Sequence, residues 1–238
     1  MNIIYVKKRR SISLYENIYV GGFFKYVNYG STEEFVQTTG AAKWNGTSWS
    51  ALGSGPGGNI YGAIIDSSDN LYVAGWGVPV SKWNGTQWST IGSGTYQNRF
   101  VTVDSSGNVY AGGSFTTAGG VSANRIAKWN GTAWSAFGTG MNSTVYTIAT
   151  DSSGNVYAGG SFTTAGGVTV NRIAKWNGTA WSALGTGMNY NVRSLATDSS
   201  GNLYAGGAFT TANGVAVNRV AKWNGTQWSA LGAGVNDA

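Results

Sequence analysis

The chain has 238 residues and a formal net charge of +6, with charged side chains at only 10% of its positions. It contains neither His nor Cys, which excludes disulfide bonds, thiol chemistry and any catalytic or metal site built on His. Gly is abundant at 38 residues, but 11 Trp, 13 Tyr and 8 Phe indicate a folded chain rather than a disordered one.

The N-terminus begins with an apolar run from Met1 to Val6, and a basic cluster follows at 7–10. A signal peptide has the opposite order, so we expect none here. No apolar run approaches the length of a bilayer span, and we therefore predict no transmembrane helix. Apart from the basic cluster, the positive charge is sparse and distributed along the chain, which argues against nucleic-acid binding.

A repeated pentapeptide organises the rest of the sequence. Lys-Trp-Asn-Gly-Thr starts at Lys43, Lys82, Lys128, Lys175 and Lys222. The period of about 47 residues fills almost the whole chain, which is typical of a repeat protein. No linker interrupts it, so we predict a single domain over 1–238. Its five units cover approximately 1–53, 54–92, 93–139, 140–186 and 187–238.

The fourth unit shows the elements of one repeat most clearly. Short apolar runs rich in Val, Ile and Tyr predict strands, and Asp-Ser-Ser-Gly-Asn and Asn-Gly predict the turns between them. In chain order we predict a strand at 145–150, a turn at 151–155, a strand at 156–162, a loop at 163–171, a strand at 172–176 and a strand at 180–184.

Tryptophan also recurs in pairs that flank the Asn-Gly turn. We expect each pair to lie on one face of the hairpin between the third and fourth strands, and to belong to the core. The pairs are 44/49, 83/88, 129/134, 176/181 and 223/228. Both faces of these strands carry apolar residues, as expected for a sheet buried between two neighbouring sheets.

The pattern Tyr157-Ala-Gly-Gly, then Ile173-Ala-Lys-Trp-Asn-Gly and Trp181, resembles a kelch blade. The segment from Ala149 to Tyr157 also resembles bacterial β-propeller repeats of the Asp-x-x-Gly-Asn-x-Tyr type. The resemblance covers all five units. It implies an all-β fold, a closed five-bladed β-propeller of four-stranded antiparallel blades with about 47 residues per repeat. It implies little about function, because propellers serve many functions.

The units differ in their degree of likeness. Residues 104–142 and 151–189 differ at only three positions, which indicates recent duplication. The first unit has a longer loop at 25–42, and the second lacks eight residues at the equivalent place. We predict that Trp76 fills the space left by that missing loop. The alternative is an exposed Trp that binds a ligand.

Chain direction places the loops between second and third strands, and the connectors between units, on one rim. These segments vary, and variable loops on a rigid scaffold favour binding. We predict ligand contacts from three Asn–Arg pairs at the ends of these loops, because Arg offers a planar fork of donors to an anionic or sugar ligand. The pairs are Asn124 and Arg125, Asn171 and Arg172, and Asn218 and Arg219. The alternative is that each Arg pairs with a local Asp or carbonyl group.

No catalytic or metal-binding constellation is apparent. The repeated Asp66, Asp104, Asp151 and Asp198 fit turn caps rather than calcium ligands, since calcium needs six to eight oxygens. A glycosidase needs a placed pair of carboxylates, and none of the other five acids lies in an informative motif. We therefore expect no enzyme activity, metal or cofactor. The repeated Asn-Gly-Thr sequons are best explained as copies of one hairpin turn.

The sequence thus favours a non-catalytic, multivalent binding or scaffold module, whose ligand is a glycan or a protein surface. The alternative is a structural repeat protein without a small-molecule ligand, produced by blade duplication. Either a monomer or a domain-swapped oligomer is compatible with near-identical repeats.

Overall fold

The computed structural model describes residues 3–7, 17–28, 35–92, 95 and 97–235. Apart from Lys7, the basic cluster lies outside these residues. Regular structure in the described part of the chain consists of strands, with no helix. Consequently, none of the described residues belongs to a helix that could cross a membrane.

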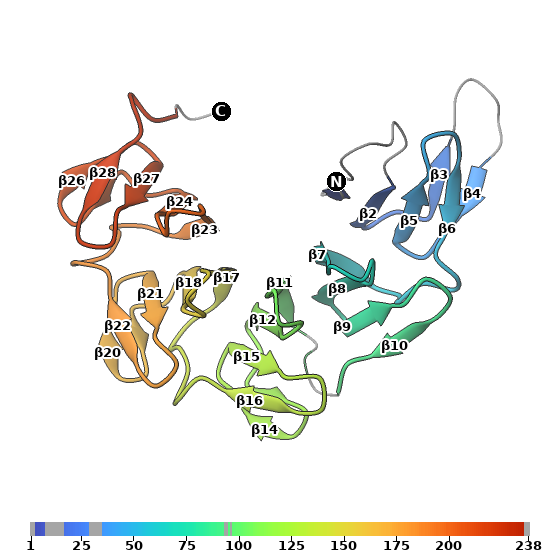
Figure 1. The fold of residues 1–238 in the computed structure, drawn as a ribbon, viewed down its shortest axis with the longest axis horizontal. Coiled ribbons are helices and arrows are strands. Elements are labelled where there is room, and N and C mark those ends of the chain that lie inside the picture. The colour runs from blue at the N-terminus through green and yellow to red at the C-terminus, as the bar shows by residue number, and fades with distance from the viewer. Residues whose placement is uncertain (1–2, 8–16, 29–34, 93–94, 96, 236–238) are drawn as a thin grey trace. The chain divides into compact units, whose positions relative to one another are not determined.

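The strands form five four-stranded antiparallel sheets, which we call blades one to five (Figure 1). Blade one contains β1 (Ile3–Lys7), β2 (Ile18–Gly22), β5 (Ala41–Trp44) and β6 (Trp49–Ala51). Blade two contains β7 (Asn59–Ile65), β8 (Leu71–Trp76), β9 (Val78–Trp83) and β10 (Trp88–Thr90). Blade three contains β11 (Asn98–Val103), β12 (Val109–Gly113), β15 (Ile126–Trp129) and β16 (Trp134–Ala136). Blade four contains β17 (Val145–Thr150), β18 (Val156–Gly160), β21 (Ile173–Trp176) and β22 (Trp181–Ala183). Blade five contains β23 (Val192–Thr197), β24 (Leu203–Gly207), β27 (Val220–Trp223) and β28 (Trp228–Ala230).

The predicted turns determine this topology. In blade four, Gly178 takes a φ of +102°, which an L side chain rarely adopts, and closes the hairpin between β21 and β22. The register places Trp176 directly opposite Trp181, with ring centroids 5.4 Å apart. Equivalent pairs occur in blades one, two and five, which confirms the predicted placement for these four of the five Trp pairs.

The prediction of a plain loop at 163–171 was wrong. This segment forms a small two-stranded hairpin whose turn residues, Gly166 and Gly167, both have positive φ. Two consecutive positive φ values suit the tight turns of hairpins. Its strands are β19 (Thr164–Ala165) and β20 (Val168–Thr169). The equivalent hairpins elsewhere are β3 (Tyr26–Asn28) with β4 (Phe35–Gln37), β13 (Thr117–Ala118) with β14 (Val121–Ser122), and β25 (Thr211–Ala212) with β26 (Val215–Ala216).

The chain divides into two compact units. Unit 1 comprises Met1–Ala111 and Trp129–Ala133, and unit 2 comprises Gly112–Lys128 and Trp134–Ala238. Unit 1 contains blades one and two, and unit 2 contains blades four and five. In unit 1 the core between blades includes Tyr19, Leu52, Ile60 and Val78, all buried. In unit 2 a larger core includes Tyr157, Leu184, Val192 and Phe209.

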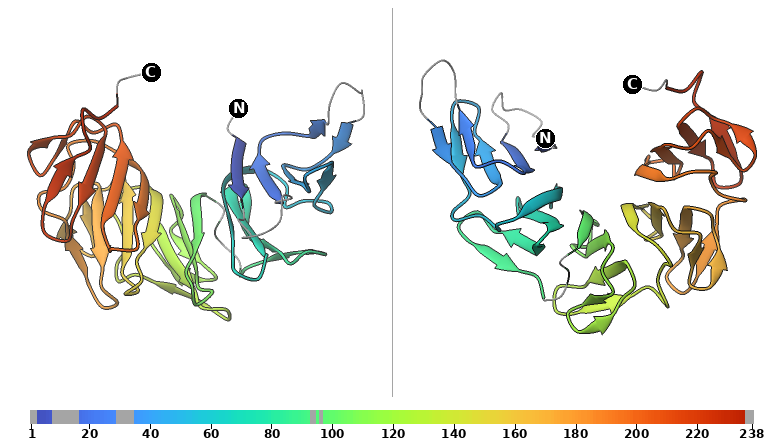
Figure 2. Two further views of the ribbon diagram at one scale, coloured as in Figure 1. Left: turned by 45° about the horizontal axis from the view of Figure 1, so that its top comes forward. Right: turned by 180° about the vertical axis from the view of Figure 1, so that it is seen from behind.

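Blades four and five pack closely within unit 2, as the orange and red strands of Figure 2 show. A Cβ atom on Gly159 would lie 2.6 Å from Val192 Cγ1 of the next blade, so only glycine permits this approach. The Trp181 indole also reaches out of its own blade, and its Nε1–H donates to the Phe137 carbonyl at 2.9 Å. Trp228 makes the equivalent bond to Leu184. Blades are therefore joined by apolar contact and by directed hydrogen bonds.

Candidate binding surface on the loop rim

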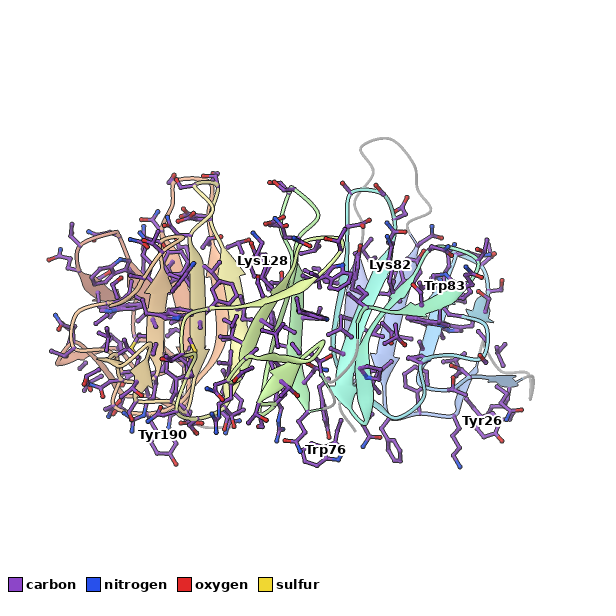
Figure 3. The ribbon with its side chains drawn as sticks, turned by 90° about the horizontal axis from the view of Figure 1, so that it is seen from below. Tyr26, Trp76, Lys82, Trp83, Lys128 and Tyr190 are labelled. Atoms are coloured by element: carbon purple, nitrogen blue, oxygen red, sulfur yellow. The ribbon has the colours of Figure 1, made fainter. Side chains whose placement is uncertain are left out.

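Each blade presents two different edges. The turn rim holds the turns between first and second strands and the Asn-Gly hairpins, while the loop rim holds the small hairpins and the connectors between blades. Figure 3 shows Tyr26 and Trp76 on the loop rim of unit 1, with Lys82 nearer its turn rim. In unit 2, Tyr190 lies on the loop rim and Lys128 nearer the turn rim.

On the turn rim, the polar groups of each turn form hydrogen bonds with one another. Asp151 Oδ1 accepts hydrogen bonds from the backbone N–H groups of Ser153 and Asn155, and Oδ2 accepts from the Asn155 amide and the Tyr157 hydroxyl. Asp66, Asp104 and Asp198 make the same set. These bonds show that the repeated Asp caps its turn, as predicted.

This network shifts the ionisation of both partners. Partial burial acts to raise the pKa of Asp151, but hydrogen bonds from Asn155, Tyr157 and Ser153 lower it by more. The pKa therefore lies below its usual value. Hydrogen bonds, led by that of the Asn202 side chain, lower the pKa of Asp198 to about 2. Burial and the neighbouring Asp66 raise the pKa of Tyr72 to about 12.

In four blades, a lysine lies over the ring of the tyrosine in the second strand. Lys175 Nζ lies 5.7 Å from the centre of the Tyr157 ring, a distance suited to a cation–π contact. The same contact joins Lys43 with Tyr19, Lys82 with Tyr72, and Lys222 with Tyr204. The repeated Lys of the pentapeptide is thus held against its own blade. This series of Lys, Tyr and Asp contacts was not predicted from the sequence, although the fixed spacing of the three residues recurs in the repeats.

The Asn of each Asn-Gly turn is likewise engaged within the turn. Asn177 Oδ1 accepts hydrogen bonds from the N–H and hydroxyl of Thr179 and from the Ala180 N–H. Asn45, Asn84, Asn130 and Asn224 make equivalent bonds. The repeated Asn-Gly-Thr sequence therefore has a structural reason that does not involve glycosylation.

On the loop rim, the predicted Asn–Arg pairs hold connectors in place. Arg125 Nη1 donates to the Met141 carbonyl at 2.9 Å, and Arg172 Nη1 donates to the Met188 carbonyl at 3.1 Å. Asn124, Asn171 and Asn218 donate from Nδ2 to the carbonyl groups of Thr139, Thr186 and Ala233. These contacts tie each pair to the connector that follows its own blade.

The backbone at these pairs is unusual. Arg125, Arg172 and Arg219 have φ values of 70°, 71° and 69°, in the left-handed region that non-glycine residues seldom adopt. The conformation turns the chain from the small hairpin into the third strand, and the three Arg side chains are half-buried there. Arg125 and Arg172 therefore combine a left-handed backbone with a carbonyl contact, which in each case uses one N–H of the guanidinium group.

On this rim, the β3–β4 hairpin of blade one borders a groove of about 630 Å³. Lys25, Tyr26, Gln37 and Thr38 are among the residues that line it. Tyr26 is 57% exposed and Phe35 is 61% exposed, and their rings meet edge to face at 6.2 Å. The groove lies in the longer, variable loop that the sequence placed on the candidate binding rim, but its aromatic lining was not predicted.

The prediction that Trp76 fills space left by the shortened loop of blade two was wrong. Its side chain is 50% exposed, the only one of the eleven Trp among the large exposed hydrophobic residues. The short connection from β8 to β9 passes through Gly77, which takes a φ of +73° with open space around it. The tight turn itself closes the gap, so the indole is left to project from the rim.

Comparisons with known proteins agree on the fold. A family described as "Domain of unknown function (DUF5122) beta-propeller" matches residues 105–130. The extracellular domain of a one-component system from B. thetaiotaomicron aligns with 95% of this chain and 27% of its own, at 12% identity and a TM-score of 0.61. The chain is a β-propeller protein. No match was found among curated proteins.

Two propeller-like structures from Xanthomonas campestris illustrate how far the likeness extends. A GH74 xyloglucanase aligns with 91% of this chain and 36% of its own, at 14% identity and a TM-score of 0.55. A gluconolactonase aligns with 78% of this chain and 65% of its own, at 10% identity and a TM-score of 0.51. The chain thus spans between about a quarter and two thirds of the length of these three structures. At such identities the likeness concerns the fold alone.

Proposed function

We propose that this protein is a non-catalytic binding module whose ligand, a glycan or a protein surface, lies on the loop rim. The observation that carries the proposal is the groove of blade one with the exposed rings of Phe23, Tyr26 and Phe35 beside it. Burying one Phe side chain stabilises a protein by roughly 1.5–3 kcal/mol. Several solvent-exposed aromatic rings close together are typical of an interaction site.

The scaffold we propose is a five-bladed propeller of kelch-like blades forming one domain over 1–238. Support comes from five consecutive four-stranded sheets that share one turn chemistry. Independently of the groove in unit 1, the three Asn–Arg pairs of unit 2 would supply repeated contacts of their own. Arg125 and Arg172 each use one N–H group to donate to a connector carbonyl. A guanidinium group has five such N–H donors. Weak repeated contacts gain through avidity.

The absence of catalysis is part of the proposal. The sequence has no His or Cys, and four of its nine acids are the turn-capping Asp residues. Hydrogen bonds hold the pKa of these carboxyl groups below the usual value, so they are ionised and already engaged at neutral pH. General acid catalysis needs a carboxyl group that keeps its proton, which is the opposite arrangement.

The test uses a glycan array together with a displayed peptide library. The wild-type protein should capture members of one of the two collections, and Tyr26→Ala should abolish the capture by removing one side of the groove. Val168→Ala is the matched control, because Val168 is an exposed apolar residue on the small hairpin of blade four. Capture that is absent in the wild type, or equal in Tyr26→Ala, would contradict the proposal.

A structural repeat protein without a small-molecule ligand is the second candidate. It is favoured by the internal hydrogen bonds of the repeated polar motifs. Asp151, Asn177 and Asn171 bond within their own repeat, and Arg172 bonds to the connector that follows it. It leaves the exposed rings of blade one unexplained. The same capture experiment separates the candidates, because a purely structural protein binds neither collection.

A further inference from the structure

The repeat register shows that Phe23 and Trp76 occupy the same position in two different blades. In the register of blades one, two and four, the Lys of the pentapeptide pairs with Tyr19, Tyr72 and Tyr157. Four residues after these tyrosines, directly beyond or at the end of the second strand, lie Phe23, Trp76 and Ser161. Blades three and five have Ser114 and Ala208 at this position.

The small residues at this position make internal contacts. Ser161 Oγ lies 2.9 Å from Ser143 Oγ, and Ser114 Oγ lies 2.9 Å from Thr144 Oγ1. Phe23 and Trp76 instead project from the rim, at 69% and 50% exposure. The repeat therefore tolerates a small polar side chain here, and the fold does not explain the two large rings.

The two rings belong to one surface of unit 1. Phe23 and Gly58 both line the groove of blade one. A Cβ atom on Gly58 would lie 3.0 Å from the Trp76 carbonyl oxygen, so the groove wall directly adjoins the backbone of Trp76. The surface therefore continues from the β3–β4 hairpin of blade one to the end of β8 in blade two, with Tyr26 and Trp76 on the same edge (Figure 3).

The chemistry of this surface indicates the class of ligand. Among the described residues that line the groove, Lys25 alone is charged, and the other polar groups are amide, hydroxyl and backbone. Among these described residues, a strongly ionic ligand would find one partner, Lys25. A sugar ring presents an apolar face of C–H groups, which an aromatic ring face attracts, and a rim of hydroxyl groups for uncharged polar partners.

We propose that Phe23 and Trp76, together with the groove of blade one, bind a linear uncharged oligosaccharide that extends across blades one and two. The inference rests on the proposed binding function and adds the ligand class and its direction. One ring from each blade stacks on a separate sugar unit, and the polar lining of the groove orients the hydroxyl groups between them.

The experiment is calorimetric titration with cello-, xylo-, manno- and malto-oligosaccharides of increasing chain length. At least one series should bind, with an affinity that rises with length until both rings are covered. Phe23→Ser and Trp76→Ser introduce the residue found naturally at this position in blades three and four, so the fold should be retained. Each should lower the affinity about tenfold. Tyr190→Ser, at an exposed connector residue of unit 2, should leave it unchanged.

Three results would overturn the inference. These are no binding by any series, affinity that is independent of chain length, or binding that survives both serine substitutions. Its failure is separable from that of the proposed function. If displayed peptides bind through Tyr26 while no oligosaccharide binds, the binding module stands and the sugar ligand is rejected. If neither collection binds, both proposals are rejected.

Discussion

The hydrogen bond from Trp181 to the preceding blade offers a quantitative test of how blades are joined. Trp181→Phe keeps an aromatic ring opposite Trp176 but removes the Nε1–H that the Phe137 carbonyl accepts at 2.9 Å. Trp181 and Phe137 are 5% and 4% exposed, so water does not readily replace the lost donor. Depriving a buried carbonyl of its partner costs about 1–3 kcal/mol. The smaller ring adds roughly 1 kcal/mol of lost burial.

Trp176→Phe is the matched control in the same hairpin. Among the contacts of the described residues, the Trp176 ring packs against Phe137 and Trp181, and its indole nitrogen makes no hydrogen bond. This variant should therefore lose only the burial contribution, roughly 1 kcal/mol. We expect urea denaturation, followed by circular dichroism, to place Trp181→Phe about 1–3 kcal/mol below the control.

Equal stability of the two variants would refute the reasoning, because the bond between blades would then contribute nothing beyond ring packing. An altered slope of the denaturation curve in Trp181→Phe alone would point to a changed unfolded or native ensemble. In that case the indole N–H resonance should be followed by NMR, and a wild-type Trp181 proton that exchanges freely with water would also contradict the bond.

Three further outcomes follow from the geometry. Ionised Asp151 stabilises the folded state, because its pKa in the folded protein is lowered from 3.8. This stabilisation is present above about pH 4 and is lost as the pH falls through the pKa of the folded state. A melting temperature that stays constant down to about pH 2 would contradict this expectation. Gly159→Val should destabilise by about 1–3 kcal/mol, since even a Cβ would lie 2.6 Å from Val192 Cγ1, and a neutral effect in urea denaturation would show that the blades separate easily. Arg172→Ala should lower stability by about 1 kcal/mol through loss of the donor to Met188, and unchanged ligand capture on the array would remove the Asn–Arg pairs from the proposed surface.

Much of the fold was predictable because its signals are local. Asn177-Gly178 and the Asp-capped turn at Asp151 determine where strands end. The Asn-Gly signal recurs in all five units and the turn Asp in four of them, which strengthens the prediction. The small hairpin at 164–169 was missed, although Gly166-Gly167 between Ala and Val is itself a hairpin signal. Short strands of two residues carry too little alternation to be recognised by periodicity.

The sequence predicted on which rim the long loop of blade one lies, whereas binding at that rim stays a prediction. The sequence alone did not show that Tyr26 and Phe35 face each other, because their contact depends on a long-range register. The left-handed conformation of Arg172 was also hidden, since nothing in the sequence marks a non-glycine residue for positive φ. An alignment of the repeats shows that Phe23 and Trp76 share one position. Only the structure shows that both rings are exposed there.

The most direct test of the account is calorimetric titration of the wild-type protein and the Phe23→Ser, Trp76→Ser double variant with the longest uncharged oligosaccharide of the panel. We predict saturable binding by the wild type and an affinity about a hundredfold lower in the double variant, as two independent stacking contacts would give. Equal binding by the two proteins, or no binding by the wild type, would contradict the claim that these two rings form a sugar platform.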